Sequence, residues 1–189
     1  MLLSQKGGSV TATSLTTGEF TTEELALNAF DEFMNLVPLA FRNYKEVEGI
    51  YIHPRVSTED KTARIDRLLI PIAGAVEAGW IYGAIGVEAK KSETKAGPLV
   101  TQALDYTRCA FELPTPKGVL VVPKWIFIYP LEVQGNEIAS VMANNRIGSA
   151  WVSRDELVFA SNHTQGLRIT RQGKIFTKPL PMVNKRGSR

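Results

Sequence analysis

Apolar residues recur at helical spacing near the start of the chain and at strand spacing after it. The helical stripe predicts a first helix that begins at Thr21, because Thr21 and Glu24 form a capping-box pattern. The apolar members of the stripe are Ala26, Phe30, Phe33, Met34 and Val37. Residues 4–18 show no periodicity and are rich in Ser, Thr and Gly, so a loose leader is predicted over residues 1–20.

Three β-strands are predicted after this helix, over residues 44–53, 62–72 and 80–90. The apolar positions of the first strand are Val47, Ile50 and Ile52. A polar run at residues 57–61 predicts a hairpin turn, and the Gly- and Ala-rich connection Ala73–Gly79 leads to the third strand. Links this short predict that the three strands pair as an antiparallel meander.

A second helix is predicted over Leu99–Leu113, with Pro98 in place to open it. The strongest strand pattern follows at Val119–Leu131, and Pro123 indicates a start after that residue. A helix between two strands is a crossover, so the third and fourth strands are expected to pair in parallel. Later segments predict a short helix near residues 138–144 and strands near 149–152, 156–160, 167–170 and 174–177. The predicted fold class is therefore α/β (α+β), with a mixed central sheet and C-terminal β-rich additions.

The composition is that of an ordinary globular protein, with 44% hydrophobic and 22% charged residues, and a single domain over residues 1–189 is expected. The net charge of +3 mildly favours an anionic partner. The single cysteine, Cys109, excludes an internal disulfide and a Cys-rich zinc or iron–sulfur site, and it fits a reducing, cytoplasmic location. His53 and His163 have no second His or Cys at ligand spacing, so no transition-metal site is expected.

Neither a signal peptide nor a membrane segment is expected. Residues 1–10 contain no apolar run fit for a signal peptide. No apolar run approaches the roughly 20 residues that a membrane span needs. We therefore expect a soluble protein without a membrane partner.

Two of the predicted strands carry charged residues where the pattern predicts apolar ones. Asp66 lies in the second strand, and Glu88 and Lys90 lie in the third. Residues two apart in a strand share a face, so Glu88 and Lys90 project together while Ala89 points away. If the strand of Asp66 lies alongside, two carboxylates and one ammonium group converge. These groups are the minimum equipment for metal-assisted phosphodiester hydrolysis.

Simpler interpretations of the same charges stay open. A Glu-x-Lys pattern on a strand is common on a solvated face of a sheet. Apolar residues flank Asp66 on both sides, which implies burial, and a buried carboxylate without a partner is costly. A structural salt bridge from Asp66 to Arg64 or Arg67 is therefore the alternative to a metal site.

The order of elements and these charges resemble the PD-(D/E)XK nuclease superfamily, whose restriction-endonuclease-like core has the order αβββαβ. Glu88, Ala89 and Lys90 match the (D/E)-X-K motif, and Asp66 matches the acidic residue of the preceding strand. The residue before Asp66 is Ile65, where the superfamily often has proline. The resemblance implies that Asp66, Glu88 and the Ala89 carbonyl hold Mg²⁺ or Mn²⁺, ions that prefer oxygen ligands. It implies that Lys90 orients the attacking water or neutralises the pentavalent intermediate.

Gln102 and Tyr106 resemble the Gln-x-x-x-Tyr helix motif of the RecB-like and phage-exonuclease-like branch. They lie four residues apart on one helical face, and the resemblance gives them positioning or DNA-contact roles. Core packing of Tyr106 and simple surface exposure of Gln102 are the alternatives. The resemblance covers a nuclease core over residues 21–131 and leaves residues 132–189 as a β-rich C-terminal extension.

Many members of the superfamily also supply a glutamate from the first helix. Glu23 is the candidate here because it shares the buried face of that helix, whereas Glu24 is explained by the capping box and Glu32 points away. A favourable interaction of Glu23 with the helix dipole is the alternative.

Basic residues also cluster in the sequence around these motifs. Lys91, Lys95 and Arg108 are candidates for contact with a DNA backbone, together with Lys117 and Lys124. A solvated charged face is the alternative explanation for the same residues.

The sequence therefore predicts a Mg²⁺-dependent deoxyribonuclease that hydrolyses DNA phosphodiester bonds. Its expected setting is recombination, repair or replication of a phage or mobile element, with a recombination or replication partner protein. A junction-resolving endonuclease fits the same residues and would be a homodimer, because two strands must be cut symmetrically. A non-catalytic DNA-binding subunit and a restriction-type endonuclease, with its specificity element in residues 131–189, are further alternatives.

Overall fold

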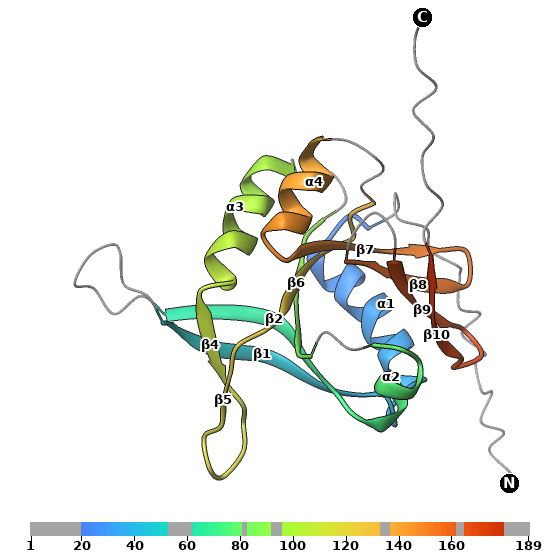
Figure 1. Cartoon of the computed structure of the whole chain (residues 1–189), viewed down its shortest axis with the longest axis horizontal. Helices are drawn as coiled ribbons and strands as arrows, with labels where there is room; N and C mark the ends of the chain where they lie inside the picture. The colour runs from blue at the N-terminus through green and yellow to red at the C-terminus, as the bar shows by residue number, and fades with distance from the viewer. Residues whose placement is uncertain are drawn as a thin grey trace, which may run out of the picture.

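One mixed β-sheet forms the frame of the structure, and helices lie on both of its faces (Figure 1). The computed structural model describes residues 20–52, 62–80, 83–91, 96–132, 137–161 and 165–179. The helices are α1 (Glu23–Asn35), α2 (Ala73–Glu77), α3 (Ala96–Tyr106) and α4 (Glu137–Asn144). The strands are β1 (Phe41–Tyr51), β2 (Thr62–Pro71), β3 (Ile85–Ala89), β4 (Cys109–Glu112), β5 (Leu120–Val121), β6 (Trp125–Tyr129), β7 (Ile147–Ser153), β8 (Glu156–Ala160), β9 (Gln165–Thr170) and β10 (Ile175–Pro179).

Neighbouring strands follow the order β10-β9-β8-β7-β6-β3-β2-β1-β4-β5. The pairs β1–β2 and β2–β3 are antiparallel, which confirms the predicted meander. β6 lies parallel to β3, which confirms the predicted crossover. β7 is parallel to β6, and the strands from β7 to β10 continue as antiparallel pairs. The described chain is thus an α+β structure built on one mixed sheet.

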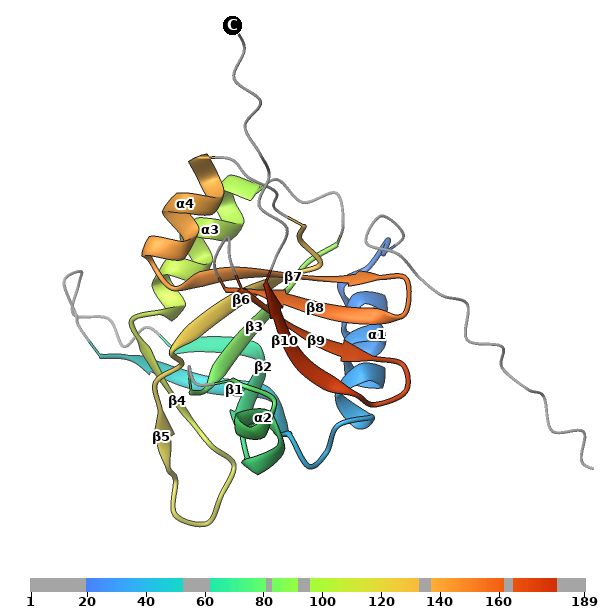
Figure 2. The same ribbon diagram turned by 45° about the vertical axis from the view of Figure 1, so that its right-hand side comes forward.

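The two faces of the sheet carry separate apolar clusters. Alternate residues of β6 divide between them, with Phe127 in one cluster and Ile126 and Ile128 in the other, because successive strand residues point to opposite sides. α1 belongs to the first cluster, with Phe30 fully buried against β6 and β8. α3 and α4 lie side by side on the other side of the sheet (Figure 2). We call these two sides the α1 face and the α3 face.

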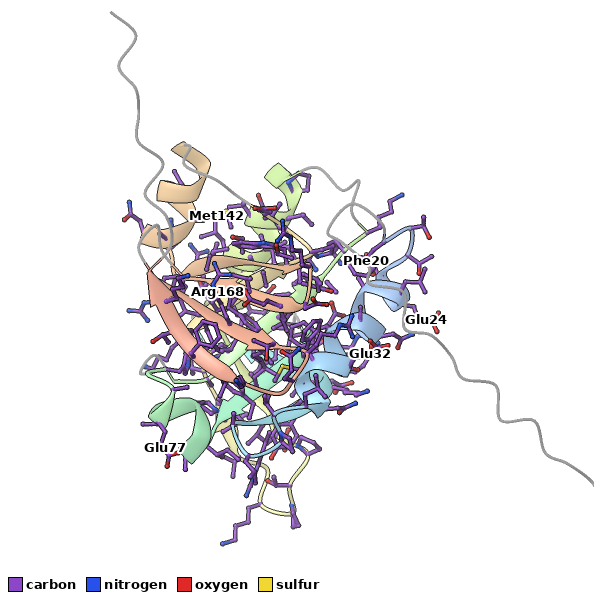
Figure 3. All side chains as sticks on the ribbon, turned by 90° about the vertical axis from the view of Figure 1, so that its right-hand side faces the viewer. Phe20, Glu24, Glu32, Glu77, Met142 and Arg168 are labelled. Atoms are coloured by element: carbon purple, nitrogen blue, oxygen red, sulfur yellow. The ribbon has the colours of Figure 1, made fainter. Side chains whose placement is uncertain are left out.

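α1 has the predicted apolar stripe but a different first residue. Thr22, not Thr21, caps the helix, because its hydroxyl accepts a hydrogen bond from the Leu25 N–H at 3.2 Å. The capping-box pattern favoured Thr21 because of Glu24, but the adjacent Thr22 offers the same hydroxyl and caps the helix without a glutamate three residues later. All the predicted stripe residues are buried: Ala26, Phe30, Phe33, Met34 and Val37. Glu24 and Glu32 are exposed and lie on the outside of α1 (Figure 3).

The predicted second helix is wrong over its last residues. α3 ends at Tyr106, and Cys109–Glu112 forms β4, which pairs antiparallel with β1. A short apolar segment suits a buried strand as well as a helix turn, so the free edge of β1 decides the outcome. A Cβ atom at Gly49 would lie 2.6 Å from the Phe111 ring, so the glycine in β1 lets β4 approach.

Two other expectations need correction. The connection Ala73–Gly79 contains the short helix α2. In β1, Val47 is buried, but Ile50 is exposed, because residues three apart in a strand lie on opposite faces and only one of these faces is covered here. Ile52, which follows β1, is exposed as well.

Further observations concern the extent of the described chain. The hairpin turn predicted at residues 57–61 lies outside the described residues, and so does nearly all of the leader predicted over residues 1–20. Within the described ranges, no helix combines the length and the apolar character that crossing a membrane requires.

Candidate functional site

The candidate site lies where β2 and β3 run side by side. Their last pair of opposed residues is Arg67 and Val87, and the next positions along the two strands are Asp66 and Glu88. The Ala89 N–H donates a hydrogen bond to Asp66 Oδ2 at 2.6 Å. The expectation that the strand of Asp66 lies alongside the strand of Glu88 is therefore confirmed.

A local irregularity in two strands sets the direction of Asp66. Ile65 and Leu68 of β2 are three residues apart, yet both pack in the cluster of the α3 face, and Tyr44 and Val47 of β1 do the same. The shift occurs where Glu46, with φ of 50°, lies opposite Asp66, and this pair is left out of the β1–β2 ladder. Such irregularities redirect side chains.

Glu88 points to the α3 face. Its strand neighbours Val87 and Ala89 are buried in the cluster of the α1 face, so alternation directs Glu88 to the other side. Glu88 is only 3% exposed. The Lys90 ammonium lies 2.7 Å from Glu88 Oε1 and 3.3 Å from Glu23 Oε1. The lysine therefore bridges the acid of β3 and the first residue of α1.

The electrostatics of the two carboxylates follow from burial and from each other. Burial raises the pKa of Glu88 to about 7, and the neighbouring Asp66 charge adds to the rise against the opposing effect of Lys90. Burial also raises the pKa of Asp66, although the Ala89 N–H and Lys90 oppose it. Burial alone would lower the pKa of Lys90, but the hydrogen bond and charge of Glu88 outweigh it, so this pKa is raised. The site thus disfavours two free carboxylates and favours a nearby cation.

The second carboxylate oxygen of Glu88 differs from the first in its partners. Within the described residues, Oε2 of Glu88 is buried and has no hydrogen-bond partner. The Tyr106 hydroxyl is close enough to lower the pKa of Glu88, but it donates its proton to the Arg64 carbonyl. A buried carboxylate oxygen without a partner is costly, because it has given up its water. Oε1 already contacts Lys90, so the free oxygen is available to a further positive group.

Gln102 and Tyr106 of α3 form a chain of hydrogen bonds that reaches β2. The Gln102 side-chain amide donates to the Tyr106 hydroxyl at 2.9 Å, and this hydroxyl donates to the main-chain carbonyl of Arg64 at 2.8 Å. Burial, with the charge of Glu88 second, raises the pKa of Tyr106, so the phenol stays neutral. The Tyr106 ring is 7% exposed and meets Phe111 edge to face, as the core-packing alternative expected. These contacts favour positioning of β2 over direct contact with DNA.

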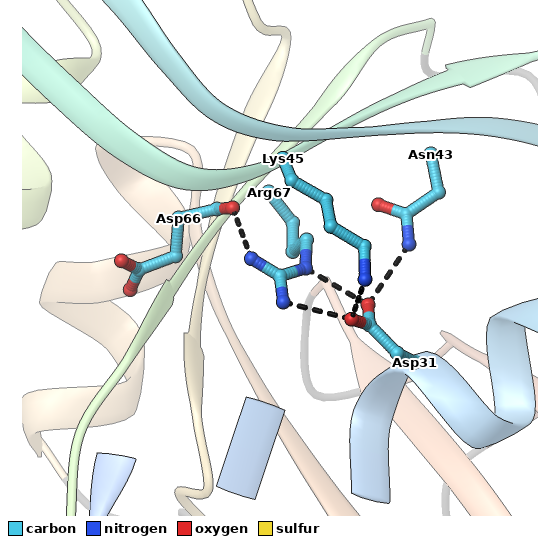
Figure 4. Close-up of polar contacts among 5 residues, drawn as sticks. All are labelled: Asp31, Asn43, Lys45, Asp66 and Arg67. Atoms are coloured by element: carbon cyan, nitrogen blue, oxygen red, sulfur yellow. Dashed lines mark hydrogen bonds and ion pairs between the residues drawn. The ribbon is translucent and has the colours of Figure 1, made fainter. Parts of the chain in front are cut away.

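The structural salt bridge from Asp66 to Arg64 or Arg67, the alternative to a metal site, is replaced by other pairs. Arg64 lies 3.1 Å from Glu46, and Arg67 pairs with Asp31 of α1. Arg67 contacts Asp66 only through its main-chain carbonyl (Figure 4). The Asp66 carboxylate therefore pairs with neither arginine and accepts a hydrogen bond from the Ala89 N–H.

The candidate DNA contacts are solvent-facing where the structure describes them. The side chains of Lys91, Arg108, Lys117 and Lys124 are exposed, which phosphate contact and a solvated face both require. Lys95 lies outside the described residues, as do His53 and His163. Their contact with DNA stays a prediction.

No family model, no curated protein and no solved structure matches this chain. The chemistry of the site therefore rests on its own geometry. In the described part of the chain, no three His, Cys, Asp or Glu side chains gather into a metal centre. Two carboxylates suit Mg²⁺ nonetheless, because this ion is usually held by one or two carboxylates and keeps several waters. The free oxygen of Glu88 and the oxygen-only donors both fit such an ion.

Sequence reasoning missed a polar group on the other face of the sheet. Asp31 and Arg67 are 7% and 5% exposed and pair with each other, and Lys45 and Asn43 also contact Asp31. One signal for this pair is present in the sequence. Asp31 is four residues after Leu27 and three before Met34, so it lies on the buried stripe of α1 and needs a buried partner.

Proposed function

We propose that this protein is a Mg²⁺- or Mn²⁺-dependent deoxyribonuclease that hydrolyses DNA phosphodiester bonds in the cytoplasm. The observation that carries the proposal is the buried Glu88 carboxylate, which has one oxygen without a partner in the described chain and lies beside Asp66 and Lys90. Acids that are kept buried against their own electrostatic cost are typical of functional sites. A divalent ion offsets that cost and supplies the Lewis acid for the reaction.

The residues divide the work by their chemistry. Asp66 and Glu88 would hold the ion, with the Ala89 carbonyl as a further oxygen ligand. Such an ion, when bound, would polarise the phosphate and lower the pKa of a water. Lys90 holds a positive charge on the same side of β3, where it offsets the charge that develops on the phosphate. Glu23, 3.3 Å from Lys90, keeps the ammonium at the end of the strand.

The order of elements supports the same proposal. α1, the antiparallel strands β1 to β3, the crossover helix α3 and the parallel strand β6 follow the αβββαβ order of a restriction-endonuclease-like core. Three additions interrupt or extend this order: α2, the β4–β5 pair and the strands from β7 to β10. We propose that the core performs the cleavage, within recombination, repair or replication of a phage or mobile element.

The test is a cleavage assay with end-labelled single-stranded, duplex and branched DNA in Mg²⁺, Mn²⁺ or EDTA. We expect cleavage with either metal and none in EDTA. Asp66→Asn and Glu88→Gln are expected to lower the rate at least about 100-fold, since even outer-shell partners of metal ligands are worth about 10–100-fold. The matched control is Glu32→Gln, an exposed acid of α1 that pairs with Arg171 at 3.2 Å.

The pattern of products separates the alternatives. Progressive loss of ends indicates an exonuclease, cutting restricted to branched DNA indicates a junction-resolving enzyme, and discrete plasmid fragments indicate a restriction-type enzyme. Binding of DNA in EDTA without cleavage in either metal would overturn the proposal in favour of a DNA-binding subunit. Cleavage by Asp66→Asn at the rate of the unmodified protein would show that the site is elsewhere.

A further inference from the structure

A polar network around the buried pair of Asp31 and Arg67 lies next to Asp66 of the candidate site (Figure 4). Arg67 and Asp31 form a two-point ion pair, in which Nε donates to Oδ1 and Nη2 to Oδ2, both at 2.8 Å. Asn43 Nδ2 donates to Oδ1 at 3.0 Å, and Lys45 Nζ lies 2.6 Å from Oδ2. An arginine fork on a carboxylate fixes both side chains in orientation as well as in distance.

The remaining arm of the guanidinium reaches the strand that carries the site. Nη1 of Arg67 donates to the main-chain carbonyl of Asp66 at 2.6 Å, while the Asp66 carboxylate points away from Arg67 (Figure 4). This carbonyl lies where the β1–β2 ladder leaves out the opposed pair of Glu46 and Asp66. Arg67 therefore supplies a hydrogen bond to the backbone at the one place where the pairing of these two strands is irregular.

We propose that the ion pair of Asp31 and Arg67 is a positioning element for the metal site, an inference that rests on the function proposed above. Asp66 is held at both ends, because the Ala89 N–H holds its carboxylate and Arg67 holds its carbonyl. Asp31 and Glu23 lie on the same helix, about 12 Å apart along its axis at 1.5 Å per residue. The pair therefore also fixes the helix that carries Glu23 against the strand that carries Asp66.

Arginine is required for this task, and lysine is not a substitute. The planar guanidinium donates in three directions at once, to both oxygens of Asp31 and to the carbonyl of Asp66. A lysine keeps the positive charge and one contact with Asp31 but lacks the rigid fork. A purely structural ion pair would need only the charge, so the two explanations differ in what Arg67→Lys does to metal binding.

The experiment compares Arg67→Lys with the matched control Lys45→Met. Lys45 is opposite Arg67 in the β1–β2 ladder and contacts the same carboxylate, but it does not contact Asp66. The readout is Mn²⁺ affinity, measured by electron paramagnetic resonance of the free ion at a temperature where circular dichroism shows each variant folded. We expect Mn²⁺ binding about 10–100-fold weaker in Arg67→Lys, the range for outer-shell partners of metal ligands, and unchanged within about twofold in Lys45→Met.

A double variant covers the case in which Arg67→Lys does not fold. Asp31→Asn with Arg67→Gln removes both charges together, so no unpaired charge is left in the core, and it also removes the fork. We expect this double variant to lose Mn²⁺ affinity over the same range. Loss of folding in both variants would overturn the proposal, because the pair would then act on the fold as a whole.

The outcomes separate this inference from the proposed function. If the unmodified protein binds Mn²⁺ and cuts DNA while Arg67→Lys binds Mn²⁺ equally well, only the positioning role is overturned. If the unmodified protein neither binds Mn²⁺ nor cuts DNA, the proposed function and the inference fall together. Weaker binding in Lys45→Met, equal to that in Arg67→Lys, would also overturn the positioning role, because loss of charge around Asp31 would then explain both.

Discussion

Asp66 and Arg67 are neighbours in β2, and each lies next to a buried carboxylate. The two carboxylates, Glu88 and Asp31, differ in how many hydrogen-bond partners they have. On the α1 face, Asp31 accepts from three side chains, and these hydrogen bonds outweigh the effect of burial and lower its pKa to about 2. On the α3 face, burial and repulsion by Asp66 raise the pKa of Glu88 to about 7, and one Glu88 oxygen has no partner among the described residues.

The difference between these faces shows how a buried charge can be interpreted. When internal hydrogen bonds and ion pairs offset the desolvation cost of a buried charge, that charge can fix two secondary-structure elements against each other, as Asp31 does for α1 and β2. A buried carboxylate with one oxygen that lacks a partner costs stability, so its retention supports the proposed metal ion. The same strand thus lies between an acid with three side-chain partners and the acid at which we propose a metal ion.

The largest expected effect comes from breaking the buried ion pair of Asp31 and Arg67 on the α1 face. Asp31→Asn leaves the Arg67 guanidinium buried without its counter-charge, and we expect a loss of about 3–5 kcal/mol in the free energy of unfolding. Urea denaturation at pH 7 measures this loss. Glu32→Gln is the control, since its exposed pair with Arg171 should contribute no more than about 1 kcal/mol. A loss below about 1 kcal/mol in Asp31→Asn would contradict the comparison.

Glu88 on the α3 face should respond in the opposite direction. The pKa of Glu88 is raised from 4.5 to about 7, so between these pH values the unfolded state releases a proton that the folded state keeps. Without metal, folding stability therefore falls as pH rises, by roughly 3 kcal/mol. Glu88→Gln should remove this cost and be more stable than the unmodified protein at pH 8 in EDTA, but not at pH 4. Thermal unfolding at the two pH values tests this, and a less stable variant at pH 8 would refute it.

Acid should weaken the ion pair of Asp31 and Arg67, because Asp31 becomes protonated. The pKa of Asp31 is lowered from 3.8 to about 2, so its contribution is complete above pH 3.8 and is lost as pH falls toward 2. The expected contribution is about 2 kcal/mol. The difference in unfolding free energy between the unmodified protein and Asp31→Asn should therefore shrink by that amount between pH 6 and pH 2. A difference that stays constant with pH would contradict the assignment.

The smallest effect concerns the hydrogen bonds of Tyr106, which connect α3 to β2. Tyr106→Phe removes a hydroxyl that donates to Arg64 and accepts from Gln102, and we expect a loss of about 1 kcal/mol in unfolding free energy. Tyr129→Phe is the matched control, because the Tyr129 hydroxyl is buried and has no partner within the described residues. This control should cost nothing. Equal losses in both variants would show that these hydrogen bonds add no stability.

Much of the candidate site is accessible to sequence reasoning because it depends on local rules. Strand alternation places Glu88 and Lys90 on one side, and short links bring the strand of Asp66 beside them. The helical spacing of Gln102 and Tyr106 likewise predicts that they meet, and their hydrogen bond bears this out. The contact of Glu23 with Lys90 joins residues far apart in sequence, and only the family resemblance suggested that this glutamate belongs to the site.

Other features depend on partners that no local pattern specifies. Cys109–Glu112 is a strand because the edge of β1 is free to accept it. Arg67 pairs with Asp31 although Asp66 is its neighbour in sequence, because the fold places α1 across β2, which no local pattern specifies. The β1–β2 ladder also leaves out the pair of Glu46 and Asp66, and the sequence shows no glycine or proline there that would signal it.

The sequence by itself determined which residues carry charge in buried strands and which of them share a face, because strand and helix periods are properties of the local backbone. Only the tertiary structure decided which acid pairs with which base, because packing sets the distance and the burial on which the energy of each ion pair depends. Asp31 is therefore held by three internal partners that lower its pKa to about 2, whereas one Glu88 oxygen has no partner among the described residues.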